Sequence, residues 1–260
     1  MQNTLDSYKP RNHIEIERKY FCSSEILGKV KRALMDSGDN GVFTGTESGD
    51  FFLDGSFDEN GRQIDTYFDT ADRLLLSKDI TLRIRQLRDR YVCTIKLPVL
   101  SKSFGGDSPI ARREYELELP LNGETNIDNN LSLIIQHRDF VMERLESVKV
   151  KEDEVFTLTE SMMSELVPIL VIMNDREKGI VKKRDSSFMC EVCLDSVRYK
   201  QPLSDATIED YQVEVELKSD YLTHVIMNSF TSKLEAVMEN YCVTEQSKLA
   251  RGLEKFGTRV

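Results

Sequence analysis

The stretch His13-Ile-Glu-Ile-Glu-Arg-Lys-Tyr-Phe21 alternates between charged and apolar side chains. Successive side chains of a β-strand point to opposite faces, so this alternation predicts a strand over residues 13–21. Glu15, Glu17 and Lys19 then share one face, and the isoleucines between them share the other. Near the other end of the chain, Val213-Glu-Val-Glu-Leu-Lys218 repeats the arrangement. The two stretches therefore predict two strands with similar charged faces.

Alternation predicts further strands along the chain. With 13–21, the predicted set comprises residues 63–69, 80–87, 91–97, 111–119, 169–183, 188–198 and 211–218. About eight strands, mostly joined by short links, favour an antiparallel barrel. Helical spacing of apolar residues predicts a helix capped by Ser23 or Ser24, an amphipathic helix over about 222–238 and a short helix near 245–256.

Two segments interrupt this series of strands. Residues 37–61 are rich in Gly, Asp, Asn and Ser, which predicts a loop or a hairpin insertion. Residues 121–167 place apolar side chains at helical spacing, which predicts an α-helical insertion. We therefore expect a single domain over residues 1–260 of the α+β class, mainly β. Its architecture would be a closed eight-stranded antiparallel β-barrel, with helices packed outside and an α-helical insertion at about 121–167.

Bulk composition narrows the class of protein. The chain is 40% hydrophobic and 31% charged, as soluble globular proteins are, and no apolar run approaches the roughly 20 residues of a membrane helix. A net charge of -10 disfavours nucleic acid as a partner. The first residues lack a signal-peptide pattern, and the five dispersed cysteines suit reduced thiols, so we expect a cytoplasmic protein. Cys190-Glu-Val-Cys193 lies in a predicted strand, where residues three apart point to opposite faces, which argues against a zinc or redox motif.

The charges of five predicted strands follow one alternation. A single charged face normally points to water. Here the acids come as Glu-x-Glu and the bases as Arg-x-Arg, and amphipathic helices are available to cover the apolar faces. The charged faces are therefore predicted to point into the barrel. The predicted lining contains the acids Glu15, Glu17, Glu114, Glu116, Asp195, Glu214 and Glu216, and the bases Lys19, Arg83, Arg85, Lys96, Lys182, Lys218 and Lys248.

This composition of the lining indicates a kind of chemistry. Paired carboxylates at i and i+2 suit hard cations such as Mg²⁺ or Mn²⁺. Arginine and lysine side chains bind phosphate oxygens. Sites of phosphoryl transfer commonly contain a metal ion together with basic side chains.

The same residues resemble the motifs of the CYTH superfamily, the triphosphate tunnel metalloenzymes. Eight motifs match in order over roughly residues 13–120 and 168–256: Glu15-x-Glu17-x-Lys19, Gln63 to Thr70, Thr81-Leu-Arg-Ile-Arg85, Thr94-Ile-Lys96, Arg113-Glu-Tyr-Glu116, Cys193 to Val197, Val213 to Lys218, and Ser247-Lys248. The resemblance implies that the barrel is a triphosphate tunnel. It also implies a metal-dependent enzyme that uses Mg²⁺ or Mn²⁺.

The resemblance further implies roles for individual residues. Metal ligands would be Glu15, Glu17, Glu214 and Glu216, with Asp195 as a ligand of a second metal. Glu114, Glu116 and Asp195 would hold that second metal or orient the attacking water. The triphosphate would be bound by Lys19, Arg83, Arg85, Lys96, Lys218 and Lys248, and by one or more of Arg176, Lys182 and Arg184. Arg176, Lys182 and Arg184 lie an even number of residues apart. On one straight strand their side chains would point to the same face, so the pattern does not choose among them.

Members of this family act on different triphosphates. The opening Glu-Ile-Glu-Arg-Lys is similar to the triphosphatase members, and the chain has no Trp on which a thiamine ring could stack. We therefore expect hydrolysis of inorganic tripolyphosphate first, then of thiamine or nucleoside triphosphate, and cyclisation of ATP third. A non-catalytic module that binds polyphosphate or a nucleotide is the remaining alternative. We expect a small-molecule triphosphate as the partner and no membrane. The pattern assigns no role to the histidines; a place for His13 near the tunnel mouth is one option, and so is a homodimer through the barrel side or the insertion.

Overall fold

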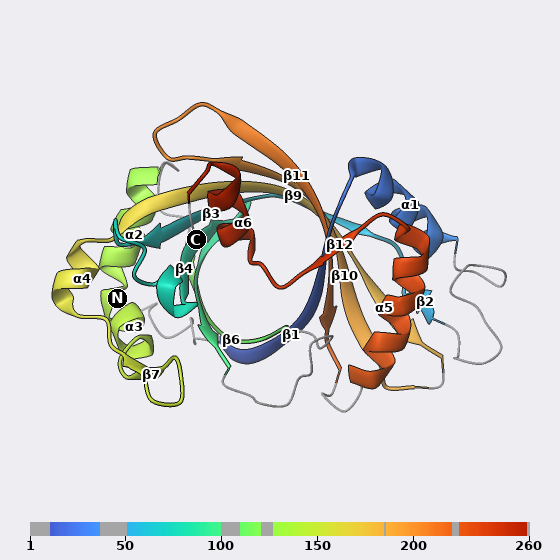
Figure 1. Ribbon diagram of the computed structural model, residues 1–260, viewed down its shortest axis with the longest axis horizontal. Helices are drawn as coiled ribbons and strands as arrows, with labels where there is room; N and C mark the ends of the chain where they lie inside the picture. The colour runs from blue at the N-terminus through green and yellow to red at the C-terminus, as the bar shows by residue number, and fades with distance from the viewer. Residues whose placement is uncertain are drawn as a thin grey trace, which may run out of the picture.

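The computed structural model describes residues 11–36, 51–99, 110–120, 127–184, 186–219 and 224–258. Its centre is a closed barrel of eight antiparallel strands (Figure 1), as predicted. Around the barrel the strands are β1 (Arg11–Cys22), β6 (Ile110–Pro120), β5 (Arg90–Pro98), β4 (Thr81–Gln86), β3 (Asp58–Asp69), β9 (Val167–Lys183), β10 (Met189–Lys200) and β11 (Thr207–Leu217). Strand β11 pairs with β1 and closes the ring.

The register between β1 and β11 brings the two similar sequence stretches together. Glu17 lies opposite Glu216, and Lys19 lies opposite Glu214. Because side chains alternate along both strands, all four of these residues point to the same face. Ile16, which lies between Glu15 and Glu17 in the sequence, points to the other face and belongs to the apolar core outside the barrel.

One flank of the barrel is covered by α1 (Ser24–Met35) and α5 (His224–Met238), which lie side by side (Figure 1). Helix α1 begins after Ser23, whose hydroxyl accepts a hydrogen bond from the Ile26 amide, so Ser23 is the N-cap. The apolar faces of both helices, including Val30 and Phe230, join the outward side chains of β1, β10 and β11 in one core. This packing keeps the charged faces of these strands on the inside.

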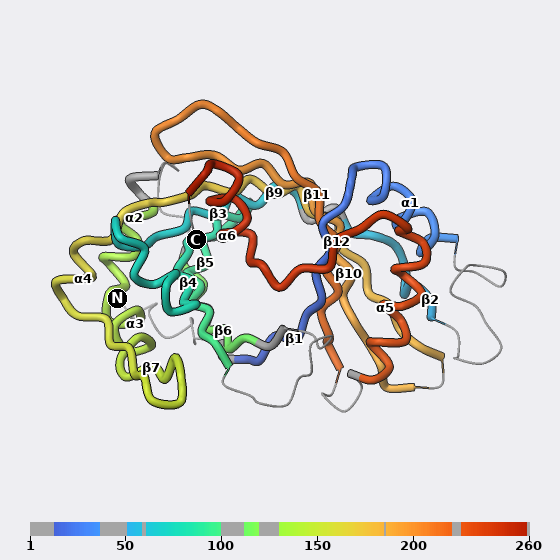
Figure 2. Tube along the Cα trace, viewed as in Figure 1, coloured from blue at the N-terminus to red at the C-terminus, as the bar shows by residue number. Residues whose placement is uncertain are grey.

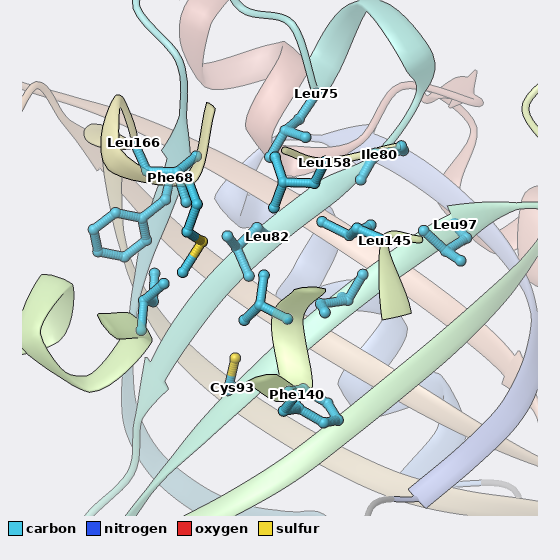
Figure 3. Close-up of a cluster of buried hydrophobic side chains, with 14 of the residues drawn as sticks. Phe68, Leu75, Ile80, Leu82, Cys93, Leu97, Phe140, Leu145, Leu158 and Leu166 are labelled. Atoms are coloured by element: carbon cyan, nitrogen blue, oxygen red, sulfur yellow. The ribbon is translucent and has the colours of Figure 1, made fainter. Parts of the chain in front are cut away.

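The opposite flank is covered by the segment between β6 and β9 (Figure 1). It contains α2 (Ile127–Gln136), α3 (Arg138–Arg144) and α4 (Glu160–Ser164), in agreement with the predicted helical insertion. Figure 3 shows Phe140, Leu145 and Leu158 of this segment gathered with Leu82 and Cys93 of the barrel strands. The segment also contains a two-stranded sheet that was not predicted, β7 (Val148–Lys149) and β8 (Val155–Phe156).

The region predicted as a loop or hairpin at 37–61 is partly strand. Residues 37–50 lie outside the described residues. β2 (Phe51–Leu53) pairs with β9, and β3 begins at Asp58 rather than at the predicted 63. Alternation alone did not indicate these pairs, because Gly and Asn in 58–61 are poor strand formers.

One end of the barrel is approached by β12 (Cys242–Thr244) and α6 (Lys248–Lys255). Strand β12 pairs with β1, and the chain then crosses toward α6 (Figure 2). Leu249 and Leu253 of α6 pack with Leu170 and Tyr199 of the barrel. A Cβ atom at Gly252 would come within 2.5 Å of Tyr199 Cδ1, so only glycine permits this close approach.

Two further predictions concern the chain as a whole. All five cysteines are free, as expected from their dispersion. Among the helices that the structure describes, none is long and apolar enough to cross a membrane.

Candidate active site

The barrel encloses a charged cavity of about 450 Å³. Side chains from the barrel strands and from the start of α6 line it. The predicted residues that line this cavity are Glu15, Glu17, Lys19, Arg83, Arg85, Lys96, Glu114, Glu116, Arg176, Glu214, Glu216, Lys218 and Lys248. The charged faces of the strands therefore point inward, as the alternation predicted.

Two arginines of β4 are fixed by one buried acid of β3. Arg85 donates two hydrogen bonds to Asp65, with Nε to Oδ1 at 2.7 Å and a terminal nitrogen to Oδ2 at 2.8 Å. Arg83 donates to the same carboxylate at 3.3 Å. The Asp65 side chain is only 2% exposed. Burial alone would raise the pKa of Asp65, but the two guanidinium groups outweigh it and hold that pKa below its usual range.

A similar arrangement fixes Arg176 of β9. Its guanidinium donates to both oxygens of Asp195, at 2.7 and 2.6 Å, and to Glu214 Oε2 at 2.5 Å. Lys248 of α6 pairs with Asp195 at 3.0 Å and also with Glu214. The Asp195 side chain is 0% exposed, and Asn174 donates to it as well. Asp195 thus lies behind the cavity lining, with its oxygens bound by cationic and amide groups.

A third group of charges joins β5, β6 and β1. Lys96 Nζ lies 2.5 Å from Glu15 Oε2 and 3.4 Å from Glu114 Oε1. His13 Nε2 lies 3.3 Å from the other oxygen of Glu114. Burial alone would raise the pKa of Glu114, but Lys96 and the His13 hydrogen bond outweigh it and lower that pKa. His13 lines the cavity and is partly exposed, so it lies near its opening.

The glutamates of β1 and β11 carry negative charge that their neighbours only partly balance. Glu17 lies 2.6 Å from Lys19 Nζ, but its Oε1 is buried without a well-oriented hydrogen bond in the described structure. Burial and then the nearby acids raise the pKa of Glu17, although Lys19 opposes this. For Glu216, burial and the charge of Glu15 raise the pKa to about 7. These carboxylates are therefore crowded, and a cation would relieve their repulsion.

The donor set of these two strands fits a hard divalent cation. Glu15, Glu17, Glu214 and Glu216 offer carboxylate oxygens from adjacent strands, which Mg²⁺ and Mn²⁺ prefer. In the present arrangement of the described residues, no three His, Cys, Asp or Glu side chains converge on one point as ligands. Glu15 instead forms an ion pair with Lys96, and Glu214 forms one with Lys248.

The structure separates three basic residues that parity could not distinguish. Arg176 lies at the middle of β9 and lines the cavity. Lys182 lies near the end of this 17-residue strand, outside the cavity, where it pairs with Asp54 at 2.5 Å. Arg184 follows the strand and is exposed. Position along the strand, and not parity, decides which base faces the cavity.

Several cavity residues were missed by the sequence analysis. Gln63 and Tyr67 lay inside a quoted motif and line the cavity, and the same alternation could have indicated that Asp65, which holds Arg83 and Arg85 from behind the lining, also points inward. Arg112 precedes Glu114 by two residues and lines the cavity on the same face. Lys178 and Glu191, which pair at 3.1 Å, gave no signal because neither belongs to a paired motif.

The fold and this lining agree with a comparison to known families. The CYTH domain matches residues 13–252, and the chain belongs to this family. A search of the curated proteins gives no match.

Solved structures of similar chains include the following three. A Bacillus halodurans protein described as a candidate adenylate cyclase is 20% identical, with a TM-score of 0.48, over 92% of this chain and 97% of that one. A candidate adenylyl cyclase from Hippeastrum, described as revealing a dominant triphosphatase activity, is 17% identical, with a TM-score of 0.46, over 95% and 97%. The Mimivirus capping enzyme triphosphatase is 12% identical, with a TM-score of 0.38, over 87% and 88%.

Proposed function

We propose that this chain is a divalent-metal-dependent triphosphatase that hydrolyses a phosphoanhydride bond, with inorganic tripolyphosphate as its first substrate. The observation that carries the proposal is the composition of one enclosed cavity. Four glutamates on two adjacent strands share it with lysines and arginines from the other strands. A binding site for an anion alone would not need the crowded carboxylates, since they repel the anion.

The basic residues would bind the phosphate chain. Arg83, Arg85 and Arg176 are held by buried aspartates, so their guanidinium groups are positioned before substrate arrives. Lys19, Lys96, Lys218 and Lys248 add further positive charges that now pair with glutamates. Entry of a triphosphate would exchange some of these pairs for phosphate oxygens.

The acidic residues would hold the metal and orient water. Glu15, Glu17, Glu214 and Glu216 are the proposed ligands of Mg²⁺ or Mn²⁺. A divalent cation bound there would neutralise phosphate charge and polarise the bond to be broken. Glu116 lines the cavity beside Glu114, and these two residues are proposed to orient the attacking water. For Asp195, the contacts to Arg176 and Lys248 favour a positioning role over direct metal binding.

The lining also bears on the group attached to the phosphates. Among the lining residues that the structure describes, Tyr67 is the only Phe, Tyr or Trp, and it is 4% exposed. A nucleobase or a thiamine ring would therefore find little aromatic surface for stacking. This supports inorganic tripolyphosphate over thiamine or nucleoside triphosphate.

Product analysis tests the proposal. Purified protein is incubated with tripolyphosphate, ATP or thiamine triphosphate, each with Mg²⁺, with Mn²⁺ or with EDTA. We expect metal-dependent release of phosphate, fastest from tripolyphosphate and absent in EDTA. Pyrophosphate together with cyclic AMP from ATP would show cyclisation instead. Tight binding of tripolyphosphate with no product under either metal would contradict the enzyme and favour a binding module.

We further propose that residues 1–260 act as one domain in the cytoplasm, with the 121–167 segment as an insertion. Homodimer formation stays a prediction, which light scattering of the purified protein would test.

A further inference from the structure

Arg112 of β6 is a cavity residue to which none of the motifs assigned a role. It lies two residues before Glu114 and opposite Glu15 in the register of β1 and β6. Its side chain is 10% exposed and lines the cavity. A buried guanidinium normally has several hydrogen-bond acceptors, because it carries five N–H donors.

The contacts of Arg112 leave part of this capacity unused. One terminal nitrogen donates to Asp79 Oδ1 at 3.0 Å. The Nε atom of Arg112 is buried and has no hydrogen-bond partner in the described part of the structure. Asp79 follows the short 3₁₀ helix η2 (Leu76–Lys78), and its side chain is 58% exposed.

The other three arginines that line the described cavity are held differently. Arg83 and Arg85 form ion pairs with Asp65, and Arg176 forms one with Asp195. Both carboxylates are buried. Removing a cation from a buried carboxylate is costly, so these pairs are fixed. Asp79 can be solvated by water when it loses its partner, and exposed pairs of this kind are weak. Arg112 is therefore the cavity arginine that can change partner most easily.

We propose that Arg112 binds a phosphate oxygen of the substrate, and that it leaves Asp79 to do so. This inference rests on the proposed triphosphate site. A phosphate group would give Nε and a terminal nitrogen two acceptors at once, which matches the planar guanidinium. Asp79 then competes with the substrate for Arg112, so the two residues have opposite effects on affinity.

The test compares the affinity for tripolyphosphate among variants of the full chain. Titration calorimetry in EDTA measures binding without turnover. Arg112→Gln is expected to weaken binding about tenfold or more, because a charge-assisted hydrogen bond is lost. Asp79→Asn is expected to tighten binding about two- to fivefold, which corresponds to the free energy of an exposed ion pair. In the Arg112→Gln background, Asp79→Asn should change nothing.

Control variants separate this effect from general charge or folding. Arg113→Gln removes the same charge from the next residue, which points outside the barrel, and should leave the affinity unchanged. Asn adopts the left-handed conformation of Asp79, whose φ is 54°, so Asp79→Asn introduces no strain. Thermal melting of each variant checks folding, and Arg112→Lys should restore part of the affinity.

Several outcomes overturn the proposal. Weaker binding in Asp79→Asn would mean that Asp79 only positions Arg112. A gain that persists in the double variant would be a general effect of removing negative charge. If wild-type protein binds tripolyphosphate but does not hydrolyse it with metal, the triphosphatase fails while Arg112 keeps its proposed role. If it binds no tripolyphosphate at all, both proposals fail.

Discussion

Two walls of the cavity differ in how their buried charges are balanced. The arginine wall consists of Arg83, Arg85 and Arg176, with the buried aspartates Asp65 and Asp195 behind them. Each guanidinium there pairs with a buried carboxylate, and Arg83 and Arg85 share Asp65. The acidic wall consists of Glu15, Glu17, Glu214 and Glu216, which line the cavity from the adjacent strands β1 and β11. The pKa of Glu17 and of Glu216 is raised there, mainly by burial and then by neighbouring acids.

The difference indicates that the charges of the arginine wall stabilise the fold, whereas those of the acidic wall are available to bind a ligand. In the arginine wall, the ion pairs are complete before anything binds, so the wall presents an ordered anion site. In the acidic wall, Glu15 and Glu214 are paired with lysines, whereas folding leaves Glu17 and Glu216 with repulsion that a bound cation would relieve. We therefore expect changes to the buried aspartates to affect mainly stability, and changes to the acidic wall to affect mainly activity.

The largest expected effect is on stability, from Asp195→Asn. This change leaves the Arg176 guanidinium buried without its bidentate partner. Breaking a buried pair by removing one partner costs about 3–5 kcal/mol. Because the lowered pKa of Asp195 shows that its ionised form stabilises the fold, the loss applies at neutral pH. Urea unfolding monitored by circular dichroism measures it.

Asp195→Asn also discriminates between two roles. If Asp195 positions Arg176 and Lys248, the variant loses stability in EDTA and in Mg²⁺ alike. Unchanged stability in EDTA, together with loss of activation by Mg²⁺, would instead identify Asp195 as a metal ligand.

The next effect is on activity, from Glu17→Gln in the acidic wall. The variant keeps the shape of Glu17 but removes one proposed ligand charge. We expect metal-dependent phosphate release from tripolyphosphate to fall by about a hundredfold or more, since metal stabilisation of the transition state is worth several kcal/mol. Wild-type turnover in this variant would remove Glu17 from the site.

Stability provides the control for Glu17→Gln. The pKa of Glu17 is raised in the folded state, so ionising it at neutral pH opposes folding. A neutral glutamine removes that penalty, and the melting temperature in EDTA should be unchanged or higher. Addition of Mg²⁺ should stabilise wild-type protein by mass action and should stabilise the variant less. A large drop in melting temperature in EDTA would mean that the two walls do not differ as argued.

The sequence predicted the barrel well because alternation is a local property. All eight barrel strands were predicted, since each needs only its own residues to show which side chains share a face. The β7–β8 pair was missed, because two residues per strand are too few to show a period. Asp65 was missed as the residue that holds Arg83 and Arg85 for another reason: its role depends on arginines that lie 18 and 20 residues away.

The smallest expected effect comes from a change at Lys182. This residue shows that alternation along a strand is not enough to place a side chain in the cavity. Lys182 and Arg176 have the same parity on β9, yet the strand is long enough for Lys182 to leave the cavity and pair with the half-exposed Asp54. Lys182→Met should therefore leave the KM for tripolyphosphate unchanged and alter the free energy of unfolding by less than about 0.5 kcal/mol. Arg176→Met, the matched change inside the cavity, should raise the KM and destabilise the fold by stranding Asp195. An equal increase in KM for both variants would show that the substrate extends along β9 beyond the cavity, and would extend the arginine wall to Lys182.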